Sequence, residues 1–226
     1  YVTSSGVYFE VRKFADYGIL SQQCLDELRP GWRIELDAEK KDPLDFALWK
    51  FTESDNEMGW PSPWGGMEGG KAPSVKRQAQ SAKRDEKHDA KSTVLGRPGW
   101  HIEDTAITEK LLGQQYDIHG GGVDLKFPHH ESEIAQQEAA SGKKPFVRVW
   151  MHVGCVMVDG VKMSKSLNNT ITVADFIQRY SVNTARLLLI GVQYRSPLNY
   201  TDALAEQTTS ALATIEEFLD KIRFVA

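Results

Sequence analysis

The sequence predicts an α/β protein with a parallel sheet. Helical and strand-like segments alternate from residue 100 onward, which favours helices packed on parallel strands. Hydrophobic residues make up 41% of the 226 residues, enough for a substantial core. A run of three glycines directly follows a strand-like segment, and ligands bind at this edge of open α/β sheets. We therefore expect a globular fold with a ligand site beside the glycines.

The first part of the chain reads as peripheral structure. Residues 1–12, "YVTSSGVYFEVR", alternate around a Ser-Ser-Gly turn and predict a β-hairpin, followed by a short helix near "SQQCLDELRPG". "DPLDFALWKF" and "GWPSPWGG" are rich in tryptophan and proline, which indicates a stiff, packed segment leading into the core.

Residues 71–91 differ in composition from their surroundings. They carry seven Lys or Arg against three Asp or Glu and contain no aromatic residue. This composition predicts an exposed insertion, either a solvated loop or a contact to a nucleic-acid backbone.

The remaining segments supply the α/β alternation. We expect a helix over 101–113, a strand over 116–122, a helix over 128–142, a strand over 147–158 and helices from Thr172 onward. Thr172 with Asp175 forms a capping box, and Gly142 is a helix stop. The tail has one apolar helix face, made by Leu204, Thr208, Ala211, Ile215, Phe218, Ile222 and Val225.

Composition narrows the class of protein. A net charge of -4 argues against a surface that is basic throughout. Cys24 and Cys155 are far apart and form no CxxC pair, so we expect a reducing compartment and no zinc knuckle. No apolar run reaches the roughly 18 residues of a membrane span, so we expect a cytoplasmic protein without a membrane partner.

The densest chemical stretch is "YDIHGGGVDLKFPHHESE". It has neither the GxGxxG spacing nor a GxxxxGK[ST] loop, yet its glycines allow close approach of a ligand. A nucleotide could bind here, with Asp124 accepting from ribose hydroxyls, or the glycines could form a tight structural turn. His129 and Glu133 lie four apart, so they could share a metal ion or form an ordinary helix-surface pair.

Two further features suggest a binding site. Trp100 stands where an element of the α/β layer begins, and could wall a small-molecule pocket or anchor the core. The segment "DGVKMSKSLNN" places Lys162 and Lys165 in a short loop between apolar segments. Such a loop could fold over a polyphosphate and supply cations where negative charge accumulates, or it could be a solvated basic turn.

Together, "KMSKS", "HGGGVDLKFPHHESEIAQ", "GRPGWHIE", "WPSPWG" and "YRSPLNY" resemble cysteinyl-tRNA synthetase, a class I aminoacyl-tRNA synthetase. The resemblance implies the second half of a Rossmann-like catalytic domain, with part of a peripheral insertion and the start of a C-terminal helical bundle. It implies that L-cysteine is activated with ATP and Mg²⁺ and transferred to tRNA(Cys).

The resemblance also assigns roles to residues. Lys165, aided by Lys162, would stabilise the transition state at the triphosphate. The residues implied in ATP binding are His119, Gly121, Asp124 and Lys165. Those implied in the substrate pocket are Trp100 and His119.

His129 and Glu133 would be ligands of the zinc ion that the family uses to bind the substrate thiolate. Asp104 stands where the family usually has a zinc-binding cysteine. A carboxylate can bind zinc but is a harder donor than a thiolate. Three occupancies of the site therefore stay open: zinc, a different metal ion, or no metal ion.

The resemblance implies three regions. Residues 1–45 would end the peripheral insertion, and residues 46–170 would form the catalytic core, which includes the basic insertion 71–91 and the KMSKS loop 162–166. Residues 171–226 would contact the tRNA stem and begin the helical bundle. The HIGH signature would precede Tyr1, and the anticodon-binding region would follow Ala226. Two alternatives remain open. One is the related ligase that joins cysteine to an amino sugar in mycothiol synthesis, and the other is a non-catalytic paralogue.

Overall fold

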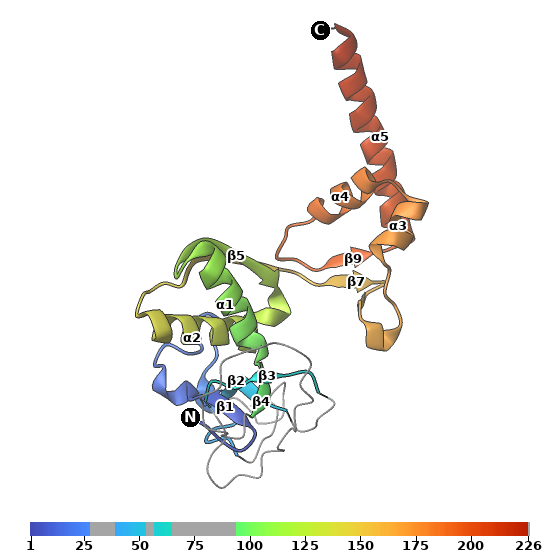
Figure 1. Ribbon diagram of the computed structural model, residues 1–226. Coiled ribbons are helices and arrows are strands. Elements are labelled where there is room, and N and C mark those ends of the chain that lie inside the picture. Colours follow the sequence, from blue (N-terminus) through green and yellow to red (C-terminus); the bar gives the residue numbers. More distant parts are fainter. Residues whose placement is uncertain (28–38, 53–56, 65–93, 226) are drawn as a thin grey trace, which may run out of the picture. The chain divides into compact units, whose positions relative to one another are not determined.

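The computed structural model describes residues 1–27, 39–52, 57–64 and 94–225 of a mixed α/β chain (Figure 1). The chain divides into two compact units. Unit 1 comprises Tyr1–Ile118 and Lys126–Val149, and unit 2 comprises His119–Leu125 and Trp150–Ala226. The three regions expected from the resemblance remain a prediction.

Unit 1 contains a four-stranded antiparallel sheet. Its strands are β1 (Gly6–Phe9), β2 (Phe46–Phe51), β3 (Trp60–Pro61) and β4 (Leu95–Pro98), in the order β1-β2-β4-β3. The hairpin expected over residues 1–12 is reduced to one bridge between Val2 and Val7, because β1 pairs along its length with β2 instead. The short helix expected after it is a 3₁₀ turn at Leu25–Glu27, and residues 28–38 lie outside the described part.

Two glycines of "GRPG" permit the packing of β4 against β2. A Cβ atom on Gly96 would collide with the indole of Trp49, and one on Gly99 would collide with the carbonyl oxygen of Ala47. Gly99 is also the residue before helix α1 (Trp100–Leu112), so this contact fixes where that helix begins.

Helices α1 and α2 (Glu131–Ser141) pack against each other in unit 1. Each ends at a glycine with positive φ, Gly113 at +91° and Gly142 at +69°, a conformation that favours glycine. The stop predicted at Gly142 is therefore confirmed. The helix expected from residue 128 begins regularly only at Glu131, because a π-helical turn (Lys126–His130) with non-helical Phe127 precedes it.

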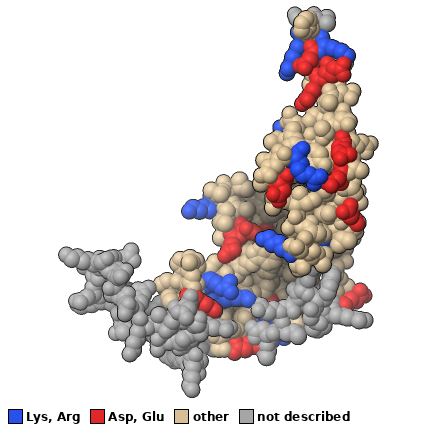
Figure 2. All heavy atoms as spheres, turned by 90° about the vertical axis from the view of Figure 1, so that its right-hand side faces the viewer, with Lys and Arg blue, Asp and Glu red and all other residues tan. Residues whose placement is uncertain are grey.

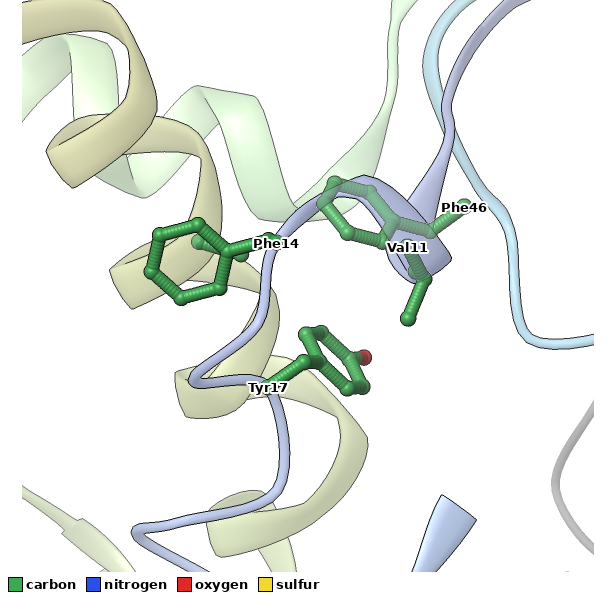
Figure 3. Close-up of a cluster of buried hydrophobic side chains, with 5 residues drawn as sticks. Val11, Phe14, Tyr17 and Phe46 are labelled. Carbon is green, nitrogen blue, oxygen red and sulfur yellow. The ribbon is translucent and has the colours of Figure 1, made fainter. Parts of the chain in front are cut away.

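The apolar core of unit 1 joins the N-terminal segment to α2 (Figure 3). Figure 3 shows the segment from Val11 to Tyr17 passing the helix, and the side chains of Phe14 and Tyr17 belong to one cluster with Ala135 of α2. The ring of Phe46 stacks on Phe9, with 5.0 Å between centroids. Burial of these rings attaches the N-terminal segment to the helix by the hydrophobic effect.

Strands β5 (Tyr116–Gly122) and β6 (Val147–Val153) form a two-stranded sheet, and the boundary between the two units crosses both strands. The single strand expected over 147–158 is interrupted after β6. The cause is Gly154, whose N–H donates to the carbonyl of Tyr194 and whose missing Cβ leaves room for the backbone of Ser196.

Unit 2 contains a three-stranded sheet in the order β8-β7-β9. Strands β7 (Val156–Val158) and β9 (Leu198–Tyr200) run parallel. The expectation of helices alone from Thr172 onward is therefore wrong at β9, because a strand of three residues is too short to show an alternating pattern. Strand β8 (Val161–Lys162) forms an antiparallel hairpin with β7 through Asp159 and Gly160, both with positive φ, the pattern of a two-residue Asp-Gly turn.

Three helices complete unit 2: α3 (Val173–Arg179), α4 (Val182–Ile190) and α5 (Asp202–Val225). The predicted capping box is confirmed, since Thr172 Oγ1 accepts from the N–H of Asp175 at 3.1 Å. The predicted tail helix is α5, which packs on α4 through buried Leu188 and Ala205, with its later residues Ile215 and Phe218 exposed. Among the described residues, no helix is both long and apolar enough to cross a membrane.

Candidate functional site

A cluster of imidazole and carboxylate groups lies where α1 faces the start of α2. His101, Asp104 and Thr105 share one face of α1, because residues three and four apart lie together on a helix. The amide of Gln136 on α2 donates to the carbonyl of His101 at 2.6 Å and also to Thr105 Oγ1. These bonds hold the two helices together beside the cluster.

The structure brings Asp104, His129 and Glu133 together. The Nε2 atom of His129 lies 2.8 Å from Asp104 Oδ2 and 2.8 Å from Glu133 Oε1. One ligand atom from each of the three residues lies within 4.8 Å of the others. One imidazole nitrogen and two carboxylate oxygens in this arrangement can hold a divalent cation. All three residues belong to unit 1, and we call them the donor set.

The charge of this cluster requires a compensating cation. Glu133 is fully buried and His129 is 3% exposed, so a carboxylate here needs a proton or a metal ion nearby. Burial by itself lowers the pKa of His129, but the hydrogen bonds and charges of Glu133 and Asp104 outweigh it and raise the pKa above its usual value. A proton on His129 can therefore take the place of a metal ion.

His101 fixes the other side of the His129 ring. Burial and the neighbouring charge of His129 lower the pKa of His101 to about 3, so this imidazole is neutral at physiological pH. The two Nδ1 atoms lie 2.7 Å apart. When His129 is protonated, its Nδ1–H donates to Nδ1 of the neutral His101, and its Nε2–H faces the carboxylates.

Trp100 lies beside the same imidazole and is not a core residue. Its side chain is 57% exposed, so the interpretation as a core anchor is wrong. The physical reason is its place at the first position of α1, where the indole stacks on the His129 ring with 4.1 Å between centroids. An exposed aromatic face next to a donor set can contact a small ligand.

In unit 2 the predicted residues Asp124 and Lys162 meet. The Nζ atom of Lys162 lies 3.1 Å from Oδ2 of Asp124, and both side chains are about half exposed. Asp124 belongs to the 3₁₀ turn Val123–Leu125 that follows the glycines of β5, and Lys162 ends β8.

The loop after Lys162 is organised around Asn169. Asn169 Oδ1 accepts from the N–H of Ser164 at 2.8 Å, and its Nδ2 donates to the carbonyl of Lys162 at 3.2 Å. Lys165 begins the 3₁₀ turn Lys165–Leu167 and is exposed. The loop backbone is therefore held from within, while its second lysine extends into solvent.

His119 and Gly121 both lie in β5. The His119 ring stacks on Trp150 of the neighbouring strand with 4.7 Å between centroids. Gly120 has no heavy atom nearer than Met151 O, 3.8 Å from where a Cβ would be. The edge of this glycine run is thus open enough for a ligand to approach the backbone.

Sequence reasoning missed two features of these sites. His101 was overlooked because a lone imidazole has no spacing signal of its own, although it lies three residues before Asp104. The Asp159–Gly160 turn that presents Lys162 carried a usable signal, since Asp-Gly between apolar runs favours a hairpin.

The basic insertion at 71–91 lies outside the described residues. Figure 2 shows Lys and Arg interspersed with Asp and Glu over the described part of the face it displays. Near the end of α5, for example, Lys221 pairs with Glu217 at 2.8 Å. This face therefore presents a mixed surface charge.

Comparison with known proteins gives consistent matches. Three relatives named Cysteine–tRNA ligase come from Thermoplasma volcanium, Nitrosomonas europaea and Halorhodospira halophila, with 41%, 47% and 49% identity over 100%, 94% and 91% of this chain. The chain spans 43%, 39% and 39% of their lengths. Among solved structures, a LeuRS–tRNA–LeuAMS complex from Agrobacterium radiobacter K84 matches with a TM-score of 0.40 and 20% identity. The match covers 46% of this chain and 14% of that chain, and the similarity is distant.

The family model described as "tRNA synthetases class I (C) catalytic domain" matches residues 1–71 and 79–210. The interruption, residues 72–78, falls within the basic segment 71–91, whose remaining residues are matched. This match covers most of the sequence, and the chain therefore belongs to the tRNA synthetases class I (C) catalytic domain family.

Proposed function

We propose that the protein containing this chain is a cysteine–tRNA ligase. It would join the carboxylate of L-cysteine to the α-phosphorus of ATP with release of pyrophosphate, and then transfer cysteine from the adenylate to a terminal ribose hydroxyl of tRNA(Cys) with release of AMP. The observation that carries the proposal is the 41–49% identity to proteins named Cysteine–tRNA ligase over nearly the whole chain.

The lysines of unit 2 support the ATP part of the proposal. Lys165 is exposed on a loop whose backbone is held by Asn169, so its ammonium group can move to a triphosphate without disrupting the loop. Lys162 would leave Asp124 for the phosphates with Mg²⁺, and Asp124 would then accept from the ribose. His119 and Gly121 would border the nucleotide on the same strand. A cation placed on the developing charge lowers the barrier by about 3 kcal/mol.

The donor set of unit 1 fits a divalent metal ion. Asp104, His129 and Glu133 would hold it, and Nδ1 of His129 would stay bonded to His101. Zinc or another divalent ion would supply a Lewis acid for the thiolate of cysteine, which distinguishes a thiol from the hydroxyl of serine. Trp100 would cover the substrate side of the His129 ring, and Asp104 makes the set harder than one with a thiolate.

The finer fold assignments belong to this proposal. The parallel β7–β9 pair would be part of a Rossmann-like sheet, α5 would begin a helical bundle, and the protein would act in the cytoplasm. The relatives are named Cysteine–tRNA ligase, so neither the mycothiol ligase nor the non-catalytic paralogue is favoured.

The test is ATP–pyrophosphate exchange by the full-length protein with cysteine, using serine as the control and quantifying bound metal in the same preparation. Cysteine-specific exchange supports the proposal. A folded protein that gives no exchange with cysteine would contradict it.

A further inference from the structure

A buried carboxylate on α2 is not used by the proposed chemistry. Glu131 is 1% exposed and is the first residue of that helix. Its Oε2 accepts from the N–H of Gly18 at 3.0 Å, and its Oε1 accepts from the N–H of Ser21 at 2.5 Å and from Ser21 Oγ at 2.9 Å. One side chain thus satisfies three donors of a loop more than 100 residues away in the sequence.

The loop is shaped for this carboxylate. Gly18 has a φ of +98°, and a Cβ atom there would collide with the carbonyl of Gln23. This conformation directs two main-chain N–H groups to one acceptor. If the carboxylate were lost, the buried N–H of Gly18 would be left unsatisfied, which costs about 1–3 kcal/mol, and the half-buried Ser21 would lose the partner of its N–H and hydroxyl. The loop conformation and Glu131 therefore depend on each other.

Glu131 and the donor set lie on opposite sides of one helical turn. Residues two apart on an α-helix differ in direction by about 200°. Glu133 lies beside His129, whereas Glu131 lies against the loop. The first turn of α2 therefore carries the candidate metal ligand Glu133 on one side and is bonded through Glu131 to the loop on the other side.

The start of α2 is irregular and has no side-chain cap. His130 occupies the N-cap position without a side-chain cap bond, and Phe127 just before it is non-helical, with φ -135° and ψ 135°. Ser132 adds one further link to the same loop, because its Oγ lies 3.0 Å from the hydroxyl of Tyr17. Contacts to residues 17–21 on one side, and the bonds to α1 on the other, therefore set the direction in which His129 and Glu133 project.

We propose that Glu131 is a positioning residue, which holds His129 and Glu133 in ligating geometry by fastening the start of α2 to the Gly18–Ser21 loop. This inference rests on the metal centre of the proposed function and assigns a role to a residue outside the donor set. Groups that hydrogen-bond to metal ligands change metal affinity by about 10–100-fold when they are replaced. Glu131 acts through the helix backbone instead, so we expect an effect near the lower end of this range.

The test compares Glu131→Gln with a matched control, Glu138→Gln, in the full-length protein. Glu138 is also buried on α2 and also accepts from a main-chain N–H, that of Phe146 at 2.9 Å, but it lies seven residues farther from the helix start. The affinities for Zn²⁺ and Co²⁺ are measured by competition with a chelating dye, the Co²⁺ absorption spectrum is recorded, and thermal unfolding is followed without metal.

We expect Glu131→Gln to lower metal affinity about tenfold or more and to change the Co²⁺ spectrum, whereas Glu138→Gln keeps both while losing comparable thermal stability. Equal metal affinity of the two variants would overturn the inference. If Glu131→Gln does not fold, Ser21→Ala removes one donor only, and about a threefold loss of affinity is expected; no loss would overturn the inference. A wild-type protein that binds neither metal defeats the proposed centre, and the inference with it.

Discussion

Lys162 Nζ lies 3.1 Å from Asp124 Oδ2, so the first lysine of the KMSKS segment is paired with the aspartate that follows the three glycines. Both side chains are about half exposed, and an ion pair of this kind is worth about 0–1 kcal/mol. The pair therefore brings two expected ATP-binding groups together at little cost. In the proposed function a triphosphate would replace the carboxylate as the partner of Lys162, and Asp124 would then be available to ribose hydroxyls.

Replacing Asp124→Asn should raise the KM for ATP about tenfold or more, because a hydrogen bond to a charged acceptor is worth about 1.5–3 kcal/mol. The unfolding free energy should change by less than about 1 kcal/mol. Steady-state pyrophosphate exchange and urea unfolding measure these two quantities. Asp117→Asn is the control, because Asp117 lies on β5, before the turn that holds Asp124, and it also pairs with a basic residue, Arg148, at 3.4 Å in an exposed position. The same KM in both variants would remove Asp124 from the ATP site.

Replacing Lys165→Ala should lower kcat for adenylation by about 100-fold or more while leaving the Kd for ATP nearly unchanged. The reason is that an exposed, mobile ammonium group contributes mainly where charge develops in the transition state. Single-turnover adenylate formation and equilibrium ATP binding separate the two effects. Lys143→Ala, at an exposed position just after α2, serves as the control. An equal loss of binding and rate would contradict the transition-state role.

Local rules predicted much of the fold from the sequence. The capping box at Thr172, the stop at Gly142 and the long tail helix all depend on neighbours within one or two turns, and all three are confirmed. The expected hairpin was wrong in extent because β1 finds its partner in β2, about 40 residues away. Pairing over such a distance leaves no local pattern.

Of the candidate metal site, only the two residues close together in the sequence could be predicted from a local pattern. His129 and Glu133 stood out by their spacing of four residues, whereas Asp104 was suggested by resemblance and His101 was missed. Both lie on α1, and their approach to His129 depends on how α1 packs on α2 through Gln136. Of the two interpretations of Trp100, only the core anchor is overturned: hydrophobicity favours burial on average, but the position of Trp100 at a helix start exposes it.

Replacing Asp104→Cys should strengthen Zn²⁺ binding and Asp104→Asn should weaken it by about tenfold, because a thiolate is a softer ligand than a carboxylate and an amide carries no charge. Competition with a chelating dye gives the affinities. The Co²⁺ form of Asp104→Cys should gain a thiolate-to-metal charge-transfer band. Affinities that do not respond to either substitution would place the metal, if bound, away from Asp104.

Replacing Gly99→Ala should destabilise unit 1 by about 1–3 kcal/mol, since the added methyl group would collide with the carbonyl oxygen of Ala47 and push α1 away from β2. Gly120→Ala is the control, because its nearest neighbour would be Met151 O at 3.8 Å and an effect within about 0.5 kcal/mol is expected. Chemical unfolding measures both. Equal stability of the two variants would show that β2 and α1 separate without cost.

Deleting residues 71–91 should weaken tRNA binding and flatten its salt dependence. This segment has a net charge of +4 in a chain of -4, and each phosphate contact contributes about 0.7–0.9 to the slope of log K against log salt concentration. Binding of tRNA(Cys) by the full-length protein, measured from low to high salt, gives that slope. The control replaces the segment with Gly and Ser residues at equal length, which removes the charge without shortening the chain. If both variants keep the wild-type slope, the segment makes no contact with the tRNA backbone, and only the interpretation as a solvated loop is left.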